Sequence, residues 1–319
     1  MKTTVFCVEG PRQFSLQKIA LLIGDTDVLV KTHQASICGT DKNIFSGKLP
    51  PGKDYPLCIG HEGGGTVLEV GPKVSRFNVG DKVMSFGTNL TFAEYFVADQ
   101  DRLQLAPAEL DFDIACLGEA IGCAVFSGLK SGINLGDTVA VFGLGFAGQI
   151  IAQIAKAKGA HKVIGIDPID KKLKLAKRLG SDIGLNPQKV DAVEAIMELT
   201  RGKGVDVAVE AAGSETSMNQ CFQVLKHNGI FVLYSWITQP IQLNVSRWHD
   251  DGLEFRSTCL VHHTIQERMV WTDWTLRPVI QGKIQIEPLI TYRYRLKDIG
   301  KAFDKVMDDP KAVKVVLKP

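Results

Sequence analysis

The sequence has 319 residues, of which 45% are hydrophobic and 23% charged, a composition typical of globular proteins. Its 37 basic and 35 acidic residues leave a formal net charge of +2, so the charge balance does not indicate nucleic acid or an anionic membrane as a partner. The chain is too long for one ordinary hydrophobic core, and we therefore expect two domains.

No apolar run approaches the roughly 20 residues that a membrane-spanning helix needs. The first residues, MKTTVFCVEG, lack the apolar core of a signal peptide. The cysteines are odd in number and scattered, and no Cys-x-x-Cys pair occurs. This pattern predicts reduced thiols in a cytoplasmic protein rather than a disulfide framework. The seven cysteines are Cys7, Cys38, Cys58, Cys116, Cys123, Cys221 and Cys259.

The first part of the chain, up to about residue 125, reads as short strands separated by turns. Gly, Pro and Asp interrupt its apolar segments every 8–12 residues, which is typical of a mostly β domain. The segments expected to form strands are 27–38, 63–71, 80–86 and 93–106.

Strands and helices alternate from about residue 135 onward. Runs rich in Val, Ile and Ala stand between amphipathic segments, which predicts a parallel sheet covered by helices on both faces. The expected strands are 138–143, 162–167, 206–213 and 229–235, and the expected helices are 147–160 and 171–181. Beyond residue 265 the sequence predicts helices over 267–283 and 296–307 and a final strand over 311–319.

A glycine-rich turn, Gly-Leu-Gly-Phe-Ala-Gly, joins the first strand of this region to its helix. Gly143 permits the tight turn, Gly145 lets a pyrophosphate approach the backbone, and Gly148 lets helix and strand pack closely. Asp167, 19 residues after Gly148, ends the next strand and is placed to accept hydrogen bonds from the ribose hydroxyls of NAD. The alternative is a turn that only packs the sheet. The turn residues expected to contact the cofactor are Gly143, Gly145, Phe146, Ala147 and Gly148.

Four other side chains offer the thiolate, imidazole and carboxylate donors that zinc takes. Cys38 stands in Cys-Gly-Thr-Asp, His61 and Glu62 follow each other in Gly-His-Glu, and Glu119 precedes Gly143 by 24 residues. Three protein ligands and one exchangeable position would make a catalytic rather than a structural site. Each residue also has an ordinary interpretation, since a cysteine is most often a small buried hydrophobe and a His-Glu pair often lies at the surface.

In these motifs and their order the sequence resembles the medium-chain dehydrogenase/reductase family, in its zinc-dependent alcohol and polyol dehydrogenase branch. The resemblance covers essentially the whole chain. It implies an α/β protein with a GroES-like, mostly β catalytic domain over 1–127 and 268–319 and a doubly wound Rossmann domain over 128–267. The motifs that carry it are ICGTD at 37–41, GHEGGGTVLEVG at 60–71, GDKV at 80–83, GLGFAG at 143–148 and VDVAVEAAG at 205–213.

The resemblance implies one catalytic zinc per chain, with Cys38 and His61 as fixed ligands. Glu119 lies where the family places its last ligand. Glu62 matches a glutamate that is a ligand in some members and exchanges with water in others, so both carboxylates are candidates. Cys123 is a weaker candidate for the last ligand, because it lies one helical turn later than Glu119.

Residues beside the ligands are assigned by the same resemblance. Asp41 matches a carboxylate bonded to the free nitrogen of the histidine ligand, and Thr40 matches the hydroxyl that takes the substrate proton. Asn43 stands where many members have the histidine that passes this proton on, and an amide cannot titrate near neutral pH. Glu62 or water would then carry the proton out. The connection 85–92 contains no cysteine, so the structural-zinc lobe of many members is missing.

The implied reaction is reversible hydride transfer between a secondary alcohol and NAD(H). A glutamate as last ligand is typical of polyol, sugar and threonine dehydrogenases, so the expected substrate is a polyol, sugar, cyclitol or amino alcohol. Family members commonly join the sheet edges of their dinucleotide domains, which implies a homodimer or homotetramer. The paired His262 and His263 either line a substrate pocket or have a structural role. Further implied cofactor contacts are Lys172, Ser235, Trp236 and Lys314.

Two other functions stay open. A zinc-free reductase of the same superfamily would not need Cys38, His61 and Glu119 together. A non-catalytic NAD-binding protein is the second alternative, since a fold alone does not prove activity; such a protein would not need Thr40.

Overall fold

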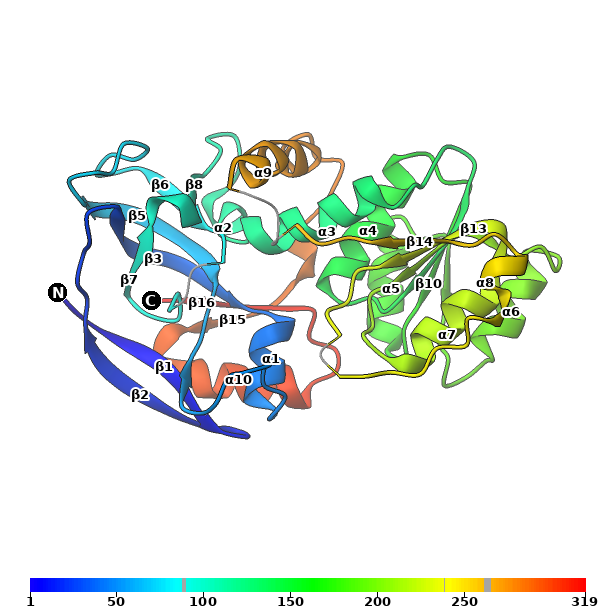
Figure 1. The fold of residues 1–319 in the computed structure, drawn as a ribbon, viewed down its shortest axis with the longest axis horizontal. Coiled ribbons are helices and arrows are strands. Elements are labelled where there is room, and N and C mark those ends of the chain that lie inside the picture. The colour runs from blue at the N-terminus through cyan, green and yellow to red at the C-terminus, as the bar shows by residue number, and fades with distance from the viewer. Residues whose placement is uncertain (88–89, 238, 261–264) are drawn as a thin grey trace. The chain divides into compact units, whose positions relative to one another are not determined.

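The structure is a computed structural model that describes residues 1–87, 90–237, 239–260 and 265–319 (Figure 1). The chain divides into two compact units. The first consists of Met1–Ala120, His263–Leu276 and Ile286–Pro319, and the second of Ile121–His262 and Arg277–Gln285.

The first unit contains two β-sheets. One has the strand order β2-β1-β4, and the other has the order β15-β16-β3-β5-β6-β8, with β7 also paired to β3. The strands are β1 (Lys2–Gly10), β2 (Gln13–Ala20), β3 (Asp27–Ile37), β4 (Leu57–Cys58), β5 (Glu62–Val70), β6 (Lys82–Ser85), β7 (Tyr95–Asp99), β8 (Leu103–Leu105), β15 (Ile290–Arg295) and β16 (Lys314–Lys318). Its helices include α1 (Gly39–Phe45), α2 (Phe112–Ala115) and α10 (Ile299–Asp308), with 3₁₀ turns at Gln100–Arg102, Glu287–Leu289 and Leu296–Asp298. The helices α3 (Gly118–Lys130) and α9 (Ile265–Ile280) cross the boundary between the units.

An aromatic cluster holds the helices of the first unit to its sheets. Phe303 of α10 stacks on Phe6 of β1, with ring centroids 4.7 Å apart, and lies 4.8 Å from the ring of Phe45 on α1. The apolar residues of α10 recur at helical spacing (Ile299, Phe303 and Val306), so one stripe of the helix faces the core. Aromatic pairs of this kind add stabilisation beyond their buried area.

The second unit is a six-stranded, fully parallel sheet in the order β11-β10-β9-β12-β13-β14. This is the strand order of a doubly wound dinucleotide-binding fold. Its strands are β9 (Thr138–Phe142), β10 (Lys162–Ile166), β11 (Ile183–Leu185), β12 (Val205–Glu210), β13 (Leu225–Leu233) and β14 (Glu254–Ser257). Its helices are α4 (Phe146–Ala157), α5 (Asp170–Arg178), α6 (Ala192–Leu199), α7 (Glu215–Val224) and α8 (Ser246–Asp250).

Alternate residues of the central strand β9 pack on opposite faces of this sheet. Val139 and Val141 belong to a core cluster with Ile151 of α4, whereas Ala140 and Phe142 belong to a second cluster that contains residues of α6 and α7. Side chains of a strand alternate between faces, so a strand covered on both sides is apolar throughout. The predicted fold class, a parallel sheet covered by helices beside a mostly β domain, is confirmed.

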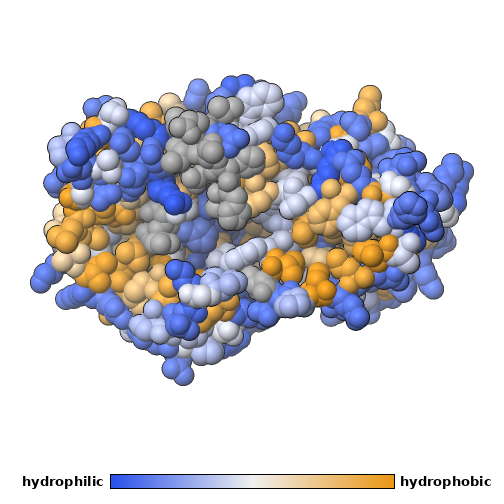
Figure 2. Space-filling model, viewed as in Figure 1, coloured by the Kyte–Doolittle hydropathy of each residue, from blue (hydrophilic) through white to orange (hydrophobic). Residues whose placement is uncertain are grey.

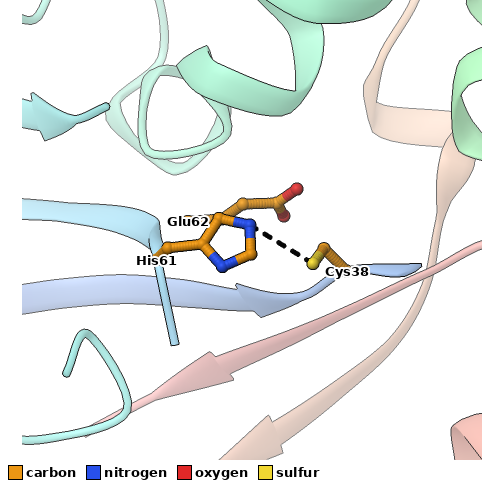
Figure 3. Close-up of side chains that lie close together, drawn as sticks. All are labelled: Cys38, His61 and Glu62. Carbon is orange, nitrogen blue, oxygen red and sulfur yellow. Dashed lines mark hydrogen bonds between the residues drawn. The ribbon is translucent and has the colours of Figure 1, made fainter. Parts of the chain in front are cut away.

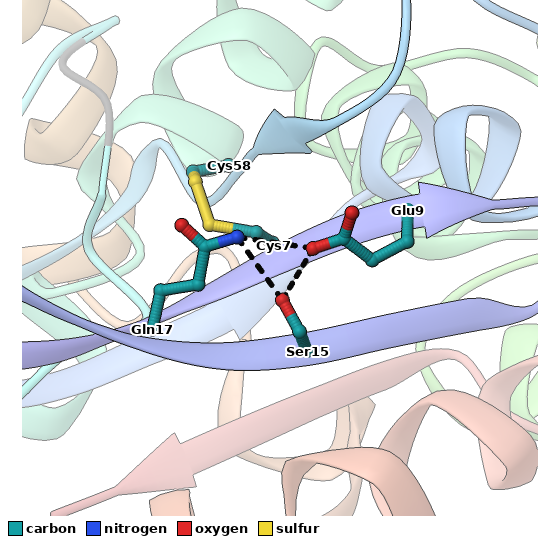
Figure 4. The surroundings of a disulfide bond; sticks show 5 residues. All are labelled: Cys7, Glu9, Ser15, Gln17 and Cys58. Atoms are coloured by element: carbon teal, nitrogen blue, oxygen red, sulfur yellow. Dashed lines mark hydrogen bonds between the residues drawn. A yellow bond between two sulfur atoms is a disulfide. The ribbon is translucent and has the colours of Figure 1, made fainter.

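One expectation about the cysteines is wrong. Cys7 and Cys58 form a disulfide, so the seven thiols are not all reduced (Figure 4). The two residues lie directly opposite each other in the antiparallel pair of β1 and β4. They are 51 positions apart in the sequence, and only this strand pairing brings them together. No spacing rule for nearby cysteines could have revealed the bond.

Among the described residues, no helix is both long enough and apolar enough to cross a membrane. On the face shown in Figure 2, hydrophobic residues form several patches among hydrophilic ones. Exposed apolar side chains are distributed along the chain, for example Leu22, Leu135 and Trp274. Single exposed hydrophobes are normal on protein surfaces.

Candidate functional site

The register of two antiparallel strands brings Cys38 and His61 together (Figure 3). In the pair of β3 and β5, Ser36 lies opposite Glu62. Cys38 follows the last residue of β3 and His61 precedes the first residue of β5, so both emerge at the same end of this strand pair. The Cys38 Sγ and His61 Nε2 atoms are 3.3 Å apart. A thiol and an imidazole nitrogen at this distance can share one metal ion.

Cys38 is also the N-cap of α1, and this cap fixes Asp41. The Asp41 amide donates to Cys38 Sγ (3.4 Å), and the Cys38 amide donates to Asp41 Oδ2 (2.9 Å), which closes a capping box. The other oxygen, Asp41 Oδ1, lies 3.8 Å from His61 Nδ1 and is a buried atom without a hydrogen-bond partner. Asp41 therefore lies on the Nδ1 side of His61, while Cys38 lies on the Nε2 side, and the predicted hydrogen bond between Asp41 and His61 stays a prediction.

Glu62 completes a group of three possible ligands. Its carboxylate, Cys38 Sγ and a ring nitrogen of His61 all lie within 4.8 Å of one another. One carboxylate oxygen, Oε2, accepts hydrogen bonds from the hydroxyl of Ser36 and from Lys314 Nζ. The sequence predicts neither contact, because Ser36 and Lys314 belong to different strands, β3 and β16, and neither lies in a recognisable motif.

Glu119 lies near this group but is not part of it in the described structure. It is in the first turn of α3, is buried, and its Oε2 accepts a hydrogen bond of 2.8 Å from the Gly87 amide. The negative charge of Glu119 contributes to the raised pKa of His61, so the two side chains are close enough to interact electrostatically. Cys123, one turn further along α3, is half-buried and forms no disulfide.

Burial and crowded acidic groups perturb the donors strongly. Burial, reinforced by Asp41, raises the pKa of the Cys38 thiol to about 11. Burial raises the pKa of Asp41 and of Glu119 as well. For His61, burial alone would lower the pKa, but Cys38 and Asp41 outweigh it and the pKa rises well above its ordinary value. A divalent cation would reverse these trends, because it stabilises the thiolate and carboxylates and competes with the imidazole proton. The donor set therefore fits zinc.

The predicted proton-transfer residues lie on the same helix as Asp41. Thr40 and Asn43 are half-buried on α1, two and five residues after Cys38. The backbone carbonyl of Asn43 accepts hydrogen bonds from Ser46 and Lys48, which fixes the end of the helix. The described contacts do not test the roles predicted for Thr40 and Asn43, which stay predictions.

In the second unit, the glycine-rich turn has the geometry that its sequence predicts. Gly143 has φ +91°, and a Cβ there would lie 2.6 Å from the Ala212 amide nitrogen. A Cβ at Gly148 would overlap the carbonyl oxygen of Gly143. At Gly145, the N-cap of α4, a Cβ would meet nothing within 4 Å. Two of the glycines are therefore needed by the fold itself, whereas the space at Gly145 leaves room for a ligand to approach the helix N-terminus.

Asp167 lies at the carboxyl end of β10 and is bonded to the turn. Its Oδ2 accepts from the Leu144 amide and its Oδ1 from the Ile169 amide, both at 2.9 Å. Each carboxylate oxygen has a second lone pair for a ribose hydroxyl. Lys172 lies half-buried on α5, where its carbonyl accepts a hydrogen bond from Gln149. The structure thus places Asp167 beside the turn, and its contact with a ribose stays a prediction.

The turn after β12 is held by Glu210, a residue to which the sequence assigned no role. Glu210 is fully buried, and its Oε1 accepts from the amides of Ala212 and Gly213 and from the hydroxyl of Ser217, at 2.7–2.9 Å. An acid at the end of a buried strand was the signal that could have found it. Ser235 follows the neighbouring strand β13, and its amide donates to the Glu210 carbonyl.

Trp236 is 53% exposed in the segment after β13. His262 and His263 lie outside the described residues.

Comparisons with known proteins agree with this arrangement. Residues 24–108 match the family profile "Alcohol dehydrogenase GroES-like domain", and residues 147–273 match "Zinc-binding dehydrogenase". The sorbitol dehydrogenase of Halalkalibacterium halodurans is 30% identical, over 100% of this chain and 99% of the relative. The L-threonine 3-dehydrogenase of Symbiobacterium thermophilum is 29% identical, over 96% of this chain and 94% of the relative.

Among solved structures, a short chain alcohol dehydrogenase from Escherichia coli CFT073 complexed with NADH has the same fold, with a TM-score of 0.87. It is 24% identical, and the alignment covers 100% of this chain and 99% of the other. The matches confirm the predicted resemblance and the predicted class of enzyme, an alcohol or polyol dehydrogenase. The chain belongs to the zinc-dependent medium-chain dehydrogenase/reductase family, in its branch of alcohol and polyol dehydrogenases.

Proposed function

We propose that this protein transfers a hydride between a secondary alcohol and NAD(H) at a zinc site built from its own first unit. The observation that carries the proposal is the group formed by Cys38, His61 and Glu62, whose ligand atoms lie within 4.8 Å of one another. The first unit would be the catalytic domain and the second the dinucleotide-binding domain, with boundaries near 1–127, 268–319 and 128–267.

Cys38 and His61 would hold the zinc, with Glu62 or Glu119 as the carboxylate donor. When bound, zinc supplies a Lewis acid that lowers the pKa of a hydroxyl at its open position. Asp41 would keep His61 protonated at Nδ1, so that Nε2 faces the metal, because the buried Asp41 Oδ1 has no other hydrogen-bond partner and lies 3.8 Å from Nδ1. Thr40 would take the substrate proton, and water or Glu62 would carry it out, because Asn43 stands at the position of the missing histidine and cannot titrate near neutral pH.

The second unit would bind the dinucleotide along the carboxyl edge of its sheet. The amides at the start of α4 would bind the pyrophosphate, since Gly145 leaves the space open. Asp167 would bind the ribose hydroxyls, and Lys172, Ser235 and Trp236 would make further contacts. Lys314 also stays a predicted pyrophosphate contact, although its Nζ is bonded to Glu62.

A polyol, sugar, cyclitol or amino alcohol is the proposed substrate. Two kinds of support converge on this class. A carboxylate rather than a second thiolate stands at both remaining ligand positions, Glu62 and Glu119, and the relatives over almost the full length are a sorbitol and a threonine dehydrogenase.

Metal analysis and a substrate screen test the proposal together. We expect one zinc per purified chain and alcohol-dependent formation of NADH that a chelator abolishes, across a panel of polyols, sugars, cyclitols and amino alcohols. Metal-free protein that reduces quinones with a nicotinamide cofactor would instead establish a zinc-free reductase. Zinc-containing protein that turns over no alcohol in the panel would favour a non-catalytic NAD-binding role.

We propose a homodimer or homotetramer in the cytoplasm. Within the described part of the chain, β14 lies at the edge of its sheet and pairs with β13 on one side, which leaves a strand edge for a second copy. Analytical ultracentrifugation tests this, and a monomer at micromolar concentration would contradict it. Cell fractionation tests the location. Recovery of the protein from an oxidising compartment, where a bond such as Cys7–Cys58 is usually retained, would contradict the cytoplasmic assignment.

A further inference from the structure

Three polar side chains on neighbouring strands form a buried row that ends at the candidate metal site. Ser36 of β3 lies opposite Glu62 of β5 on one side and opposite Val316 of β16 on the other. Lys314 precedes Val316 by two residues and therefore points to the same face of the sheet. The hydroxyl of Ser36 and the ammonium group of Lys314 both donate to Glu62 Oε2.

This ion pair is almost free of solvent. The exposed fraction is 3% for Lys314 and 5% for Glu62, and Ser36 is fully buried. Lysine is rarely buried to this degree unless it is paired, and removal of one partner of a buried pair leaves an uncompensated charge. Among the described residues, Lys314 is the only partner in an ion pair with Glu62. The lysine thus determines where the glutamate carboxylate rests.

The same carboxylate is within reach of a metal. Glu62 shares the 4.8 Å group with Cys38 and His61, so a divalent cation held by these two residues would attract it. Two cationic centres, Lys314 and the metal, therefore compete for one buried carboxylate. Pairing with Lys314 holds Glu62 back, and loss of that pairing would release it to the metal.

We propose that Lys314 is a positioning residue that retains Glu62 and thereby keeps one coordination position of the metal open for substrate. This inference rests on the proposed zinc site. It gives Lys314 a task different from the predicted contact with the cofactor pyrophosphate, and the two tasks have different consequences. A pyrophosphate contact would alter dinucleotide affinity, whereas retention of Glu62 would alter the metal.

The test replaces Lys314 with Met, which keeps the length of the side chain and removes its charge. Each variant is purified with zinc and also with Co²⁺ in its place, because the visible absorption of Co²⁺ reports its ligands. In Lys314→Met we expect a changed Co²⁺ spectrum, loss of metal to a chelator about tenfold slower than in the wild type, and a lower kcat. The dissociation constant for NADH, measured by fluorescence, should change less than about twofold, well short of the tenfold that 1.4 kcal/mol represents.

Three further variants decide the interpretation. Lys314→Arg keeps the charge and should keep the wild-type spectrum. Ser36→Ala removes the other donor to Glu62 and should shift the spectrum and the metal loss in the same direction by a smaller amount. Ser36→Ala also tests the proposal if Lys314→Met does not fold. In a Glu62→Gln background, addition of Lys314→Met should leave the Co²⁺ spectrum unchanged, because the carboxylate that Lys314 retains is then absent.

An unchanged Co²⁺ spectrum and unchanged metal loss in both Lys314→Met and Ser36→Ala would overturn the proposal. So would a spectral change in Lys314→Met that persists in the Glu62→Gln background. Weaker binding of NADH, with an unchanged Co²⁺ spectrum and unchanged metal loss, would show that Lys314 acts as a contact to the pyrophosphate. Wild-type protein that binds neither zinc nor Co²⁺ would instead refute the proposed metal site itself, so the two failures are distinguishable.

Discussion

The two units of this protein build their sites in different ways. In the second unit, the residues expected to meet the dinucleotide are neighbours in the chain: the turn 143–148 and Asp167 at the end of the next strand. In the first unit, the candidate metal site combines Cys38 and His61 from the ends of two strands with Lys314 from a strand near the C-terminus. The first kind of site depends on local geometry and the second on strand register.

This difference determines how a substitution should act. A change in the glycine-rich turn alters a local backbone conformation, so its effect should be limited to binding of the dinucleotide. A change in the strand-built site alters contacts between segments that are far apart in the sequence, so it should affect the metal and the stability of the unit together.

The largest expected effect is that of removing a fixed metal ligand. Cys38→Ser should reduce bound zinc below one tenth of a mole per mole and lower kcat/KM by more than about 100-fold, because loss of a direct ligand exceeds the 10–100-fold effect of residues behind the ligands. Cys259→Ser is the matched control, since Cys259 is an exposed free thiol. Metal analysis and steady-state rates measure both. Full zinc content in Cys38→Ser would refute the assignment of this ligand.

The sequence predicted the second unit more completely than the first. The parallel sheet and the helices at 147–160 and 171–181 follow from runs of apolar residues and from helical spacing, and α4 and α5 lie close to these positions. In the first unit, the seven-residue helix α1 was not predicted, although it carries Asp41. The capping box that starts α1 uses a cysteine, which is not among the usual N-cap residues.

The candidate site shows the same division. Cys38, His61 and Asp41 were identified from a motif, and the structure brings them together. The Ser36–Glu62–Lys314 row and the Cys7–Cys58 bond were not foreseen, because they depend on which residues face each other across paired strands. A shift of one residue in such a pairing would turn every side chain to the other face, and single-sequence patterns do not specify that register.

The disulfide allows the strand-built region to be tested for stability. Cys7→Ser combined with Cys58→Ser should lower the free energy of unfolding by about 4 kcal/mol, because the bond closes a loop of 51 residues and so restricts the unfolded chain. Denaturant unfolding measures this, with Cys221→Ser as a control for a buried free thiol. Thiol titration of the denatured, unreduced protein should give five thiols. Seven would show that the bond is absent.

A smaller effect, confined to the cofactor, is expected in the locally built site. Gly145→Ala should weaken NADH binding by about tenfold, or about 1.4 kcal/mol, because the new methyl group would occupy the space through which the pyrophosphate approaches. The melting temperature without cofactor should stay within about 1 °C, since a Cβ at this position meets nothing within 4 Å. Gly143→Ala is the contrasting variant and should also lower the melting temperature, because Gly143 has φ +91°. Equal melting temperatures for the two variants would contradict this division.

The smallest expected effect concerns the charge of Asp309, which contacts one strand and one helix of the first unit. The hydroxyl of Tyr292 on β15 and the ammonium group of Lys305 on α10 hold the pKa of Asp309 well below its usual range. A carboxyl with a lowered folded pKa stabilises the protein above its unfolded pKa of about 3.9, and this contribution is lost as the pH falls through the folded value.

Asp309→Asn should therefore lower the melting temperature at pH 7 by about 1–2 °C, the size expected of a partly exposed ion pair in a chain of this length. The difference from the wild type should shrink progressively below about pH 4, where the carboxyl of the unfolded wild-type chain also becomes protonated. Thermal unfolding between pH 3 and pH 8 measures both. Asp308→Asn is the neighbouring control, because the Asp308 side chain is 60% exposed in its pair with Arg12. A difference for Asp309→Asn that is constant across this range would show that Asp309 acts through packing or hydrogen bonding, and that its charge is not what links β15 to α10.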